Sequence, residues 1–266
     1  MLARRLFLTI PVAFVMTVPQ VSWSHDPVFS PGPHTIYKGG VEYHLEGRRT
    51  EAGGNAEKEY ELAALYGITG DWTAGIELPY IDGDDEDGAG NVALRTKYRF
   101  WRDDRLRVQE SAALLGRVFL DTYDDAGGSG ATDVLAGVTY GYESVTWYRW
   151  ASARYRYNGE NEAGIDRGDK VFLDTVVGIR LRELDYRQPD AVWMLELNGE
   201  HTQRSELGGR ELDDTGGTEL FLSPGLMWTY RNVAIKPGVQ IPIYSNLYGD
   251  QDATDFRALV ELEVHL

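Results

Sequence analysis

Cysteine is absent from the chain, which excludes disulfide bonds and every chemistry that needs a thiol. Positive charge is scarce: 26 lysine and arginine residues face 42 aspartate and glutamate residues, for a formal net charge of −16. A chain this acidic repels phosphate backbones, so we expect no nucleic-acid partner. Long apolar runs are also missing, because after residue 24 no stretch reaches the ~18 apolar residues that a transmembrane helix requires.

Residues 1–24 have the composition of a secretory signal peptide. A short start with two arginines precedes an apolar stretch, Leu6–Val18, which is long enough for a signal but short for a membrane helix. Ser22 and Ser24 then offer small residues at the −3 and −1 positions, so we predict cleavage after Ser24. The mature chain would begin at His25, and losing the two arginines would take its net charge from −16 to −18.

From residue 34 onward, segments alternate between apolar and polar side chains and are separated by turn residues. In one of them Trp72, Ile76 and Leu78 share a face, and Glu77 lies on the other. About twelve such segments start near positions 34, 58, 72, 91, 105, 132, 145, 169, 191, 218, 232 and 254. An even number of strands of this length is typical of a closed membrane barrel, which pairs every backbone group in a medium without water.

We therefore predict an all-β protein, a transmembrane antiparallel up-and-down β-barrel over residues 34–266. Residues 25–33 would form a periplasmic amino-terminal segment ahead of it. The expected location is the outer membrane of a Gram-negative bacterium, with membrane lipid and lipopolysaccharide around the barrel. The outer-membrane assembly machinery is a further expected partner, because the last strand ends on the apolar Leu266.

The connections between segments alternate in length. The short ones are 70–71, 102–104, 143–144, 185–190 and 231–232, and the long ones are 47–57, 82–90, 121–131, 159–168, 205–217 and 246–253. Outer-membrane barrels keep short turns in the periplasm and long loops outside the cell, so we expect both termini on the periplasmic side. Acid is densest in the loop from Asp82 to Asp87, and loop 205–217 is long enough to fold into the barrel as a plug.

Three stretches carry a resemblance to a known family: HDPVFSPGPHT at 25–35, GIELPY at 75–80 and PGVQIPIY at 237–244. Together they resemble the outer-membrane transporter family known as "MetA-pathway of phenol degradation". The resemblance implies a barrel related to channels for small, often hydrophobic compounds. It also implies that Pro79 and Pro242 belong to the family pattern, although proline cannot donate to a strand ladder.

Charged side chains of both signs face the interior by the same alternation. The candidates for the lumen lining are Glu77, Arg95, Lys97, Arg99, Arg117, Asp133, Arg154, Arg156, Asp174, Arg180, Glu196, Glu200, Lys236, Arg257 and Glu261. One interpretation is a water-filled lumen that selects small solutes by charge and width. The other is a network of ion pairs that fills a narrow barrel, since charges in a confined interior must pair or be hydrated. At about twelve strands the interior can be either.

The function predicted from these features is a passive channel or transporter for small molecules, possibly hydrophobic or aromatic ones, with no cofactor. A barrel with a filled lumen and a structural or copper-handling role is the alternative. An enzyme is the weaker reading, because His44 and His201 lack a nucleophile or acid at a motif spacing, although Asp213 and Asp214 follow His201 in the next loop.

The copper alternative depends on the mature amino terminus. If the chain begins at His25, its free amine and its imidazole can chelate Cu(II), and imidazole is a preferred copper ligand. His34 lies nine positions further on and could add a third nitrogen. The acidic run at 82–88 does not fit a calcium loop, because the required glycine and the final glutamate are missing.

Overall fold

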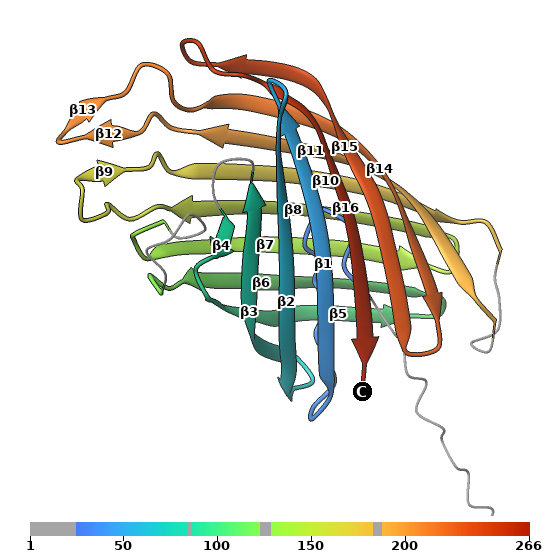
Figure 1. The fold of residues 1–266 in the computed structure, drawn as a ribbon. Helices are drawn as coiled ribbons and strands as arrows, with labels where there is room; N and C mark the ends of the chain where they lie inside the picture. The colour runs from blue at the N-terminus through green and yellow to red at the C-terminus, as the bar shows by residue number, and fades with distance from the viewer. Residues whose placement is uncertain (1–24, 84–86, 123–128, 183–187) are drawn as a thin grey trace, which may run out of the picture.

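The computed structural model describes residues 25–83, 87–122, 129–182 and 188–266, so the predicted signal peptide and the acids at 84–86 lie outside the described residues. Twelve long antiparallel strands follow one another around a ring (Figure 1): β1 (Val41–Ala52), β2 (Asn55–Thr69), β3 (Trp72–Gly83), β5 (Ala93–Arg105), β6 (Val108–Phe119), β7 (Asp133–Ser144), β8 (Trp147–Tyr157), β10 (Lys170–Arg180), β11 (Asp190–Thr202), β14 (Gly217–Tyr230), β15 (Val233–Leu247) and β16 (Thr254–His265). The ring closes because β1 pairs with both β2 and β16, and β3 pairs with β5. The predicted twelve-stranded up-and-down barrel is confirmed.

Each strand presents one face outward and one inward. On β3, Trp72, Ile76 and Leu78 are 41–45% exposed, whereas Glu77 between them is 1% exposed. Apolar side chains therefore form the outer wall, as contact with hydrocarbon requires, and polar side chains face the lumen. Within the part of the chain that the structure describes, no helix is long and apolar enough to cross a membrane.

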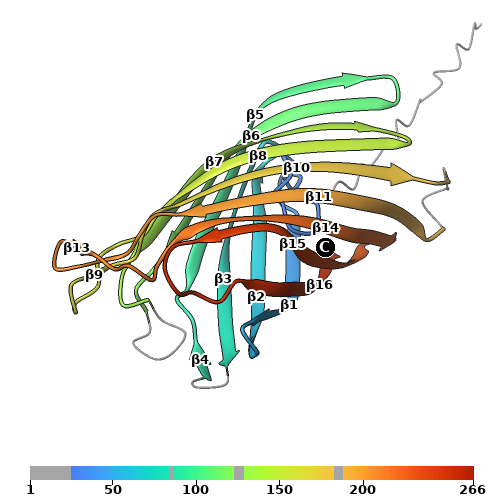
Figure 2. The ribbon, with the colours of Figure 1, turned by 90° about the horizontal axis from the view of Figure 1, so that it is seen from above.

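The two rims of the barrel differ in their connections. At the rim where β1 meets the carboxyl terminus, the backbones of Val41 and Leu266 bond to each other at 2.8 and 3.2 Å. Two-residue turns such as 70–71 and 231–232 lie at this rim. Most connections at the other rim are longer (Figure 2), and there β12 (Glu206–Leu207) pairs with β13 (Arg210–Glu211) and β9 (Ile165–Asp166). Loop 205–217 thus builds a small sheet at the rim rather than a plug.

Several connections and boundaries differ from the prediction, and the short turns expected at 102–104 and 143–144 lie at 106–107 and 145–146. The expected loop 47–57 is a tight hairpin, in which Ala52 faces Asn55 across Gly53 and Gly54. Both glycines have positive φ angles, 58° and 87°, which a two-residue hairpin turn of this type requires. The residues on either side of this turn belong to β1 and β2, and their polar composition is the reason that the sequence predicted a loop. The first strand also begins at Val41 rather than near residue 34.

The prolines inside the strands lie where the ladder is interrupted. Pro79 comes two residues after Glu77, the last residue of β3 that pairs with β5. Beyond that point β3 pairs instead with the short β4 (Asp87–Ala89). Pro242 lies at a register shift between β14 and β15, where Ile243 between Pro242 and Tyr244 has no partner on β14. Because the missing N–H groups fall at these irregularities, the prolines do not contradict the barrel.

Candidate functional site

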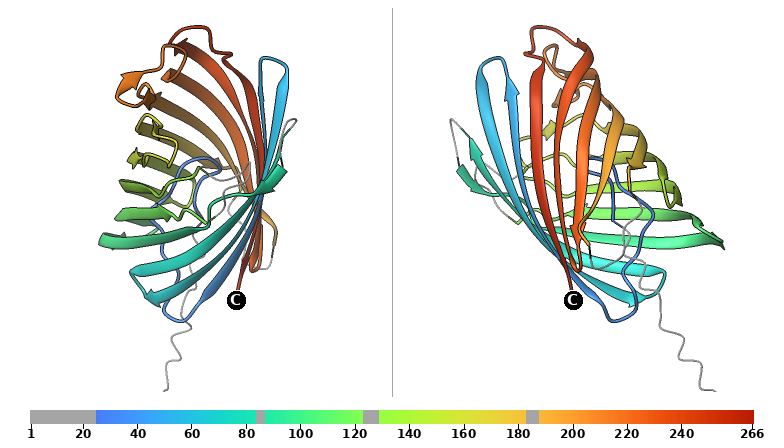
Figure 3. Two further views of the ribbon diagram at one scale, coloured as in Figure 1. Left: turned by 60° about the vertical axis from the view of Figure 1, so that its left-hand side comes forward. Right: turned by 90° about the vertical axis from the view of Figure 1, so that its right-hand side faces the viewer.

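The segment ahead of β1 runs inside the ring of strands, in blue in Figure 3. The backbone N–H groups of Val28 and Phe29 donate to Glu196 Oε1 at 2.9 and 3.1 Å, and the Ser30 hydroxyl donates to Oε2 at 2.5 Å. The sequence placed residues 25–33 ahead of the barrel as a periplasmic segment, and this interpretation missed their place in the lumen. We call residues 25–33 the plug.

Further polar contacts hold the plug and the chain after it along the inner wall. Lys97 on β5 donates to both carboxylate oxygens of Asp26, at 2.7 and 2.9 Å. Thr139 on β7 donates to the backbone oxygen of Pro31 at 2.8 Å. His34 contacts Glu143 at the end of β7. These partners come from different strands, so the plug is bonded across the lumen.

A buried apolar cluster contacts the middle of the plug. Val28 is 5% exposed and belongs to a buried cluster with Tyr148, Trp150, Val176, Val192, Met194, Met227 and Leu259, and Phe29 packs against this cluster. Full burial of a valine side chain contributes about 1.5–3 kcal/mol. Sequence reasoning missed this cluster, although Tyr148 and Trp150 share a face of β8 with the inward Ser152.

Two inward glycines make room for these side chains. A Cβ at Gly225 would lie 2.8 Å from Val28 Cγ2, and one at Gly238 would lie 2.7 Å from Phe29 Cε2. Real Cβ atoms do not approach other carbons this closely, so a larger residue at either position would collide with the plug. The glycines thus mark where the strands and the plug touch.

None of the fifteen predicted lumen residues is exposed, and each has a polar partner. Glu77 pairs with Arg95 at 3.3 Å and with Arg117, which also reaches Glu61 at 2.7 Å. Asp133 receives Arg156 and Arg167. The remaining pairs are Arg154–Asp174, Arg257–Glu200, Lys236–Glu261, Lys97–Asp26, Arg99–Asp71 and Arg180–Asp190. Glu196 instead accepts the hydrogen bonds of the plug.

Arg99, Arg180, Asp133 and Glu196 line neither of the two cavities that lie beside the plug, and they bind other parts of the barrel or the plug. Arg99 binds the turn at 70–71 through the Gly70 backbone oxygen at 2.7 Å. Arg180 pairs with Asp190 at 2.7 Å at the same rim. The other predicted residues border open space.

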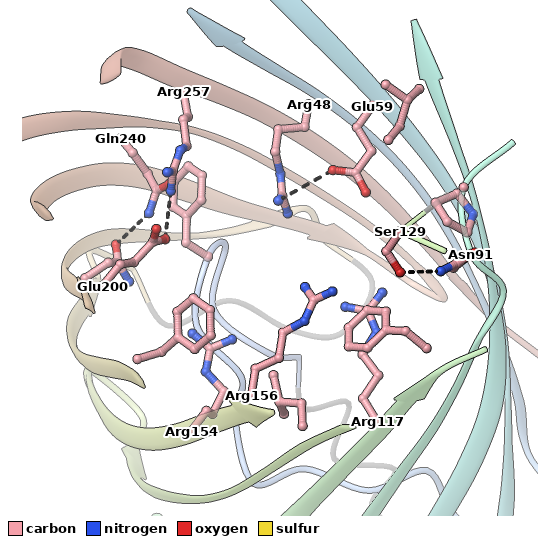
Figure 4. A pocket seen from close by; sticks show the side chains of 18 of the residues that line it. Arg48, Glu59, Asn91, Arg117, Ser129, Arg154, Arg156, Glu200, Gln240 and Arg257 are labelled. Carbon is pink, nitrogen blue, oxygen red and sulfur yellow. Dashed lines mark hydrogen bonds and ion pairs between the residues drawn. The ribbon is translucent and has the colours of Figure 1, made fainter. Parts of the chain in front are cut away.

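Two cavities lie beside the plug. The larger has a volume of about 480 Å³ and is seen in Figure 4, and the smaller has about 200 Å³ and runs along the plug itself. They adjoin, because the same five residues line both: Phe29, Arg48, Arg117, Leu135 and Arg154. The two cavities therefore share part of their wall beside the plug.

Guanidinium groups dominate the wall of the larger cavity (Figure 4). Six arginines, Arg48, Arg117, Arg154, Arg156, Arg167 and Arg257, face three carboxylates, Glu59, Asp174 and Glu200. Aromatic rings lie under several of them: the guanidinium of Arg154 is 4.8 Å from the Phe172 ring centre, and that of Arg156 is 4.1 Å from the Phe119 ring centre. In a chain of net charge −16, this wall presents a local excess of positive groups.

The histidines separate into different environments. His25 Nδ1 lies 2.5 Å from Glu263 Oε2 and 3.2 Å from His265 Nε2. His34 contacts Glu143 instead, so it does not join His25 as the sequence suggested. His201 bonds to Thr218 Oγ1 at 2.9 Å. The acids that follow it have other partners: Asp213 lies 3.8 Å from Arg204, and Asp214 accepts the Asp250 amide.

No protein-family model matches the chain, and no curated protein matches it. Solved structures do. The barrel is similar to the COG4313 outer membrane channel from Pseudomonas putida F1, with a TM-score of 0.70 at 11% identity over 89% of this chain and 99% of that one. It is also similar to the NanC porin, with a TM-score of 0.54 at 14% identity over 84% of this chain and 100% of that one.

A third similar structure is the beta domain of the Bordetella autotransporter BrkA, with a TM-score of 0.50 at 13% identity over 86% of this chain and 100% of that one. At these identities the likeness shows the fold, which is that of outer-membrane β-barrels. These three neighbours are a channel, a porin and the beta domain of an autotransporter. The resemblance to the phenol-degradation family stays a prediction.

Proposed function

We propose that this protein is a passive outer-membrane channel for small molecules, in which solute moves past the plug. The observation that carries the proposal is the pair of adjoining cavities beside the plug, which share Phe29 and four wall residues in their lining. The short-turn rim would face the periplasm together with both ends of the mature chain. Lipopolysaccharide would surround the outer rim, and the outer-membrane assembly machinery would insert the barrel.

The cavity wall favours small organic solutes that combine a negative charge with an apolar or aromatic part. Guanidinium groups bind carboxylates well, and six of them line the larger cavity. Phe119 and Phe172 offer ring faces beside these donors. This solute class is compatible with the small, often hydrophobic compounds that the family resemblance implies.

A second candidate is a barrel with a filled lumen and a structural role. The plug and the ion pairs across the lumen favour it, because they occupy much of the interior. Flux distinguishes the two. Purified mature protein in liposomes should pass small organic anions such as benzoate and exclude large sugars. Liposomes that stay sealed to every small solute would overturn the channel and leave the structural candidate.

The selectivity of the channel should depend on Arg154, which lines both cavities. A unit charge about 10 Å from a permeating ion in water changes its free energy by about 0.4 kcal/mol, or about twofold in occupancy. Because the same charge attracts anions and repels cations, Arg154→Gln should lower the anion-to-cation permeability ratio about fourfold. Asp174 keeps its bonds to Ser152 and Asn198 in this variant.

Reversal potentials in a salt gradient measure this ratio in planar bilayers. Arg102→Gln is the matched control, since Arg102 pairs with Asp104 near the rim and lines neither cavity. An unchanged ratio in Arg154→Gln, or an equal change in both variants, would refute the assigned solute path.

A further inference from the structure

Three metal-ligating atoms converge where the plug begins. His25 Nδ1, His265 Nε2 and Glu263 Oε2 are separated by 2.5, 3.2 and 3.9 Å. Ligand atoms bound to one metal at about 2.0–2.1 Å lie about 2.9–3.4 Å apart in square-planar or tetrahedral geometry. The observed separations bracket this range, so small side-chain shifts suffice for all three atoms to bind one ion.

The surroundings of the three ligands are arranged as in a metal site. All three residues are buried, with exposed fractions of 1–8%. Glu42 Oε2 lies 2.9 Å from His265 Nδ1, which leaves Nε2 directed at the site. A carboxylate on the far nitrogen of a ligating histidine is the usual outer partner in metal sites, because it fixes the tautomer and orientation of the ring.

Glu263 is held in a similar way. Lys236 binds Oε1, so Oε2 is the oxygen that faces the two imidazoles. The histidine rings meet edge to face, with centres 4.8 Å apart and planes at 73°, and His265 Nε2 lies 3.2 Å from His25 Nδ1. A single imidazole nitrogen would be enough to hydrogen-bond the Glu263 carboxylate. Two imidazole nitrogens close to that carboxylate are better explained by a shared metal ion.

We propose that His25, His265 and Glu263 form a buried Cu(II) site that joins the amino terminus to the last strand of the barrel. In a chain that begins at His25, the α-amine is a fourth donor, because it forms a six-membered chelate ring with Nδ1 of the same residue. Nδ1 is the nitrogen that the structure directs at Glu263. The donor set is then three nitrogens and one oxygen.

This donor set selects copper over the other common divalent ions. Calcium and magnesium prefer oxygen ligands, whereas imidazole and amine nitrogens suit the later transition metals. Among these, affinity for a given nitrogen site peaks at Cu(II). The three proposed ligands lie outside the two cavities, since His25, Glu263 and His265 line neither of them. The proposal therefore stands apart from the channel function.

A bound ion would connect the plug to β16, at the place where β16 pairs with β1 and closes the barrel. Glu263 and His265 lie on β16, and Glu42 lies opposite His265 on β1. Metal at this point would connect the first residue of the plug to the two strands that close the ring. Copper should therefore raise the thermal stability of the folded barrel as well as bind to it.

The experiment uses purified mature protein, freed of metal with a chelator and titrated with copper sulfate. Intact mass first establishes the first residue of the chain. We expect one copper per chain by elemental analysis and an electron paramagnetic resonance spectrum with nitrogen splitting that changes on ¹⁵N-histidine labelling. Wild-type protein that binds no more copper than a variant lacking His265 overturns the proposal.

Variants assign the ligands. His265→Gln should lose tight binding, and Glu42→Gln, which keeps all three ligands, should weaken it about 10–100-fold. His201→Gln is the control, because this histidine lies outside the cluster and bonds to Thr218. Circular dichroism checks folding. Equal affinity in His265→Gln and wild type refutes the site, whatever Glu42→Gln does.

The amine is tested separately with a chain that carries Gly-Ser ahead of His25. Blocking the α-amine in this way should remove one nitrogen from the spectrum and weaken binding, while the imidazoles and Glu263 stay in place. An unchanged spectrum, or a natural chain that begins at another residue, removes the amine from the ligand set and overturns that part of the proposal.

Discussion

Conductance should rise several-fold when residues 25–33 are deleted from the mature chain. The plug crosses the lumen beside the cavities, and an extended chain takes up a width of about 5 Å. A twelve-stranded interior lies between filled and open, so losing this width enlarges the narrowest section of the path. Single-channel recordings in planar bilayers measure the change. Unchanged conductance would mean that wall side chains close the barrel, and the filled-lumen candidate would be favoured.

Point variants should reproduce part of this effect without shortening the chain. Glu196→Ala removes the acceptor of three hydrogen bonds from the plug, and each bond to a charged group contributes about 1.5–3 kcal/mol. Gly238→Val places carbon atoms against Phe29 and Val28 and should displace the plug by collision. In recordings of both variants, the channel should open transiently to the larger conductance that we expect for the deletion of residues 25–33.

Gly47→Val is the matched control for the glycine variant. A Cβ at Gly47 meets the Tyr60 ring at an ordinary 3.8 Å and does not approach the plug. Its conductance should equal that of wild type. If Gly47→Val opens the channel as much as Gly238→Val, then general loosening of the wall, rather than loss of the plug, causes the effect.

The barrel could be predicted because each strand has lipid on one face and the polar lumen on the other, so apolar and polar side chains alternate along it. The exposed Trp72 and Ile76 and the buried Glu77 lie where a period of two residues places them. Loop lengths were less reliable, since charged residues such as Arg49 and Glu51 occur in strands that extend to the rim as well as in loops. Only Gly53 and Gly54 identify the turn there.

The plug could not be found from the same pattern. Its principal partner, Glu196, is 168 residues from Val28, and no periodicity connects such distant positions. The sequence did contain weak signals: inward glycines at Gly225 and Gly238 and the inward Trp150 are unusual on a polar face. The histidine cluster was partly anticipated through His25, whereas its partner proved to be His265 rather than His34.

The largest loss of stability should follow Lys236→Met. The Lys236 side chain is 1% exposed, binds Glu263 and lies 3.1 Å from Glu261. Its removal leaves two buried carboxylates without their common cation, and breaking a buried pair in this way costs about 3–5 kcal/mol. Urea unfolding of the metal-free protein in lipid vesicles measures the change in free energy.

Lys58→Met is the matched control, because Lys58 pairs with Asp82 at 3.0 Å while both side chains are more than 40% exposed. Exposed pairs contribute about 0–1 kcal/mol, so this variant should be nearly as stable as wild type. The double variant Lys236→Met, Glu263→Gln should recover part of the loss by removing one unpaired charge. If Lys236→Met costs no more than Lys58→Met, water must reach Glu261 and Glu263 freely, and the lumen at the plug would be hydrated rather than sealed by its ion pairs.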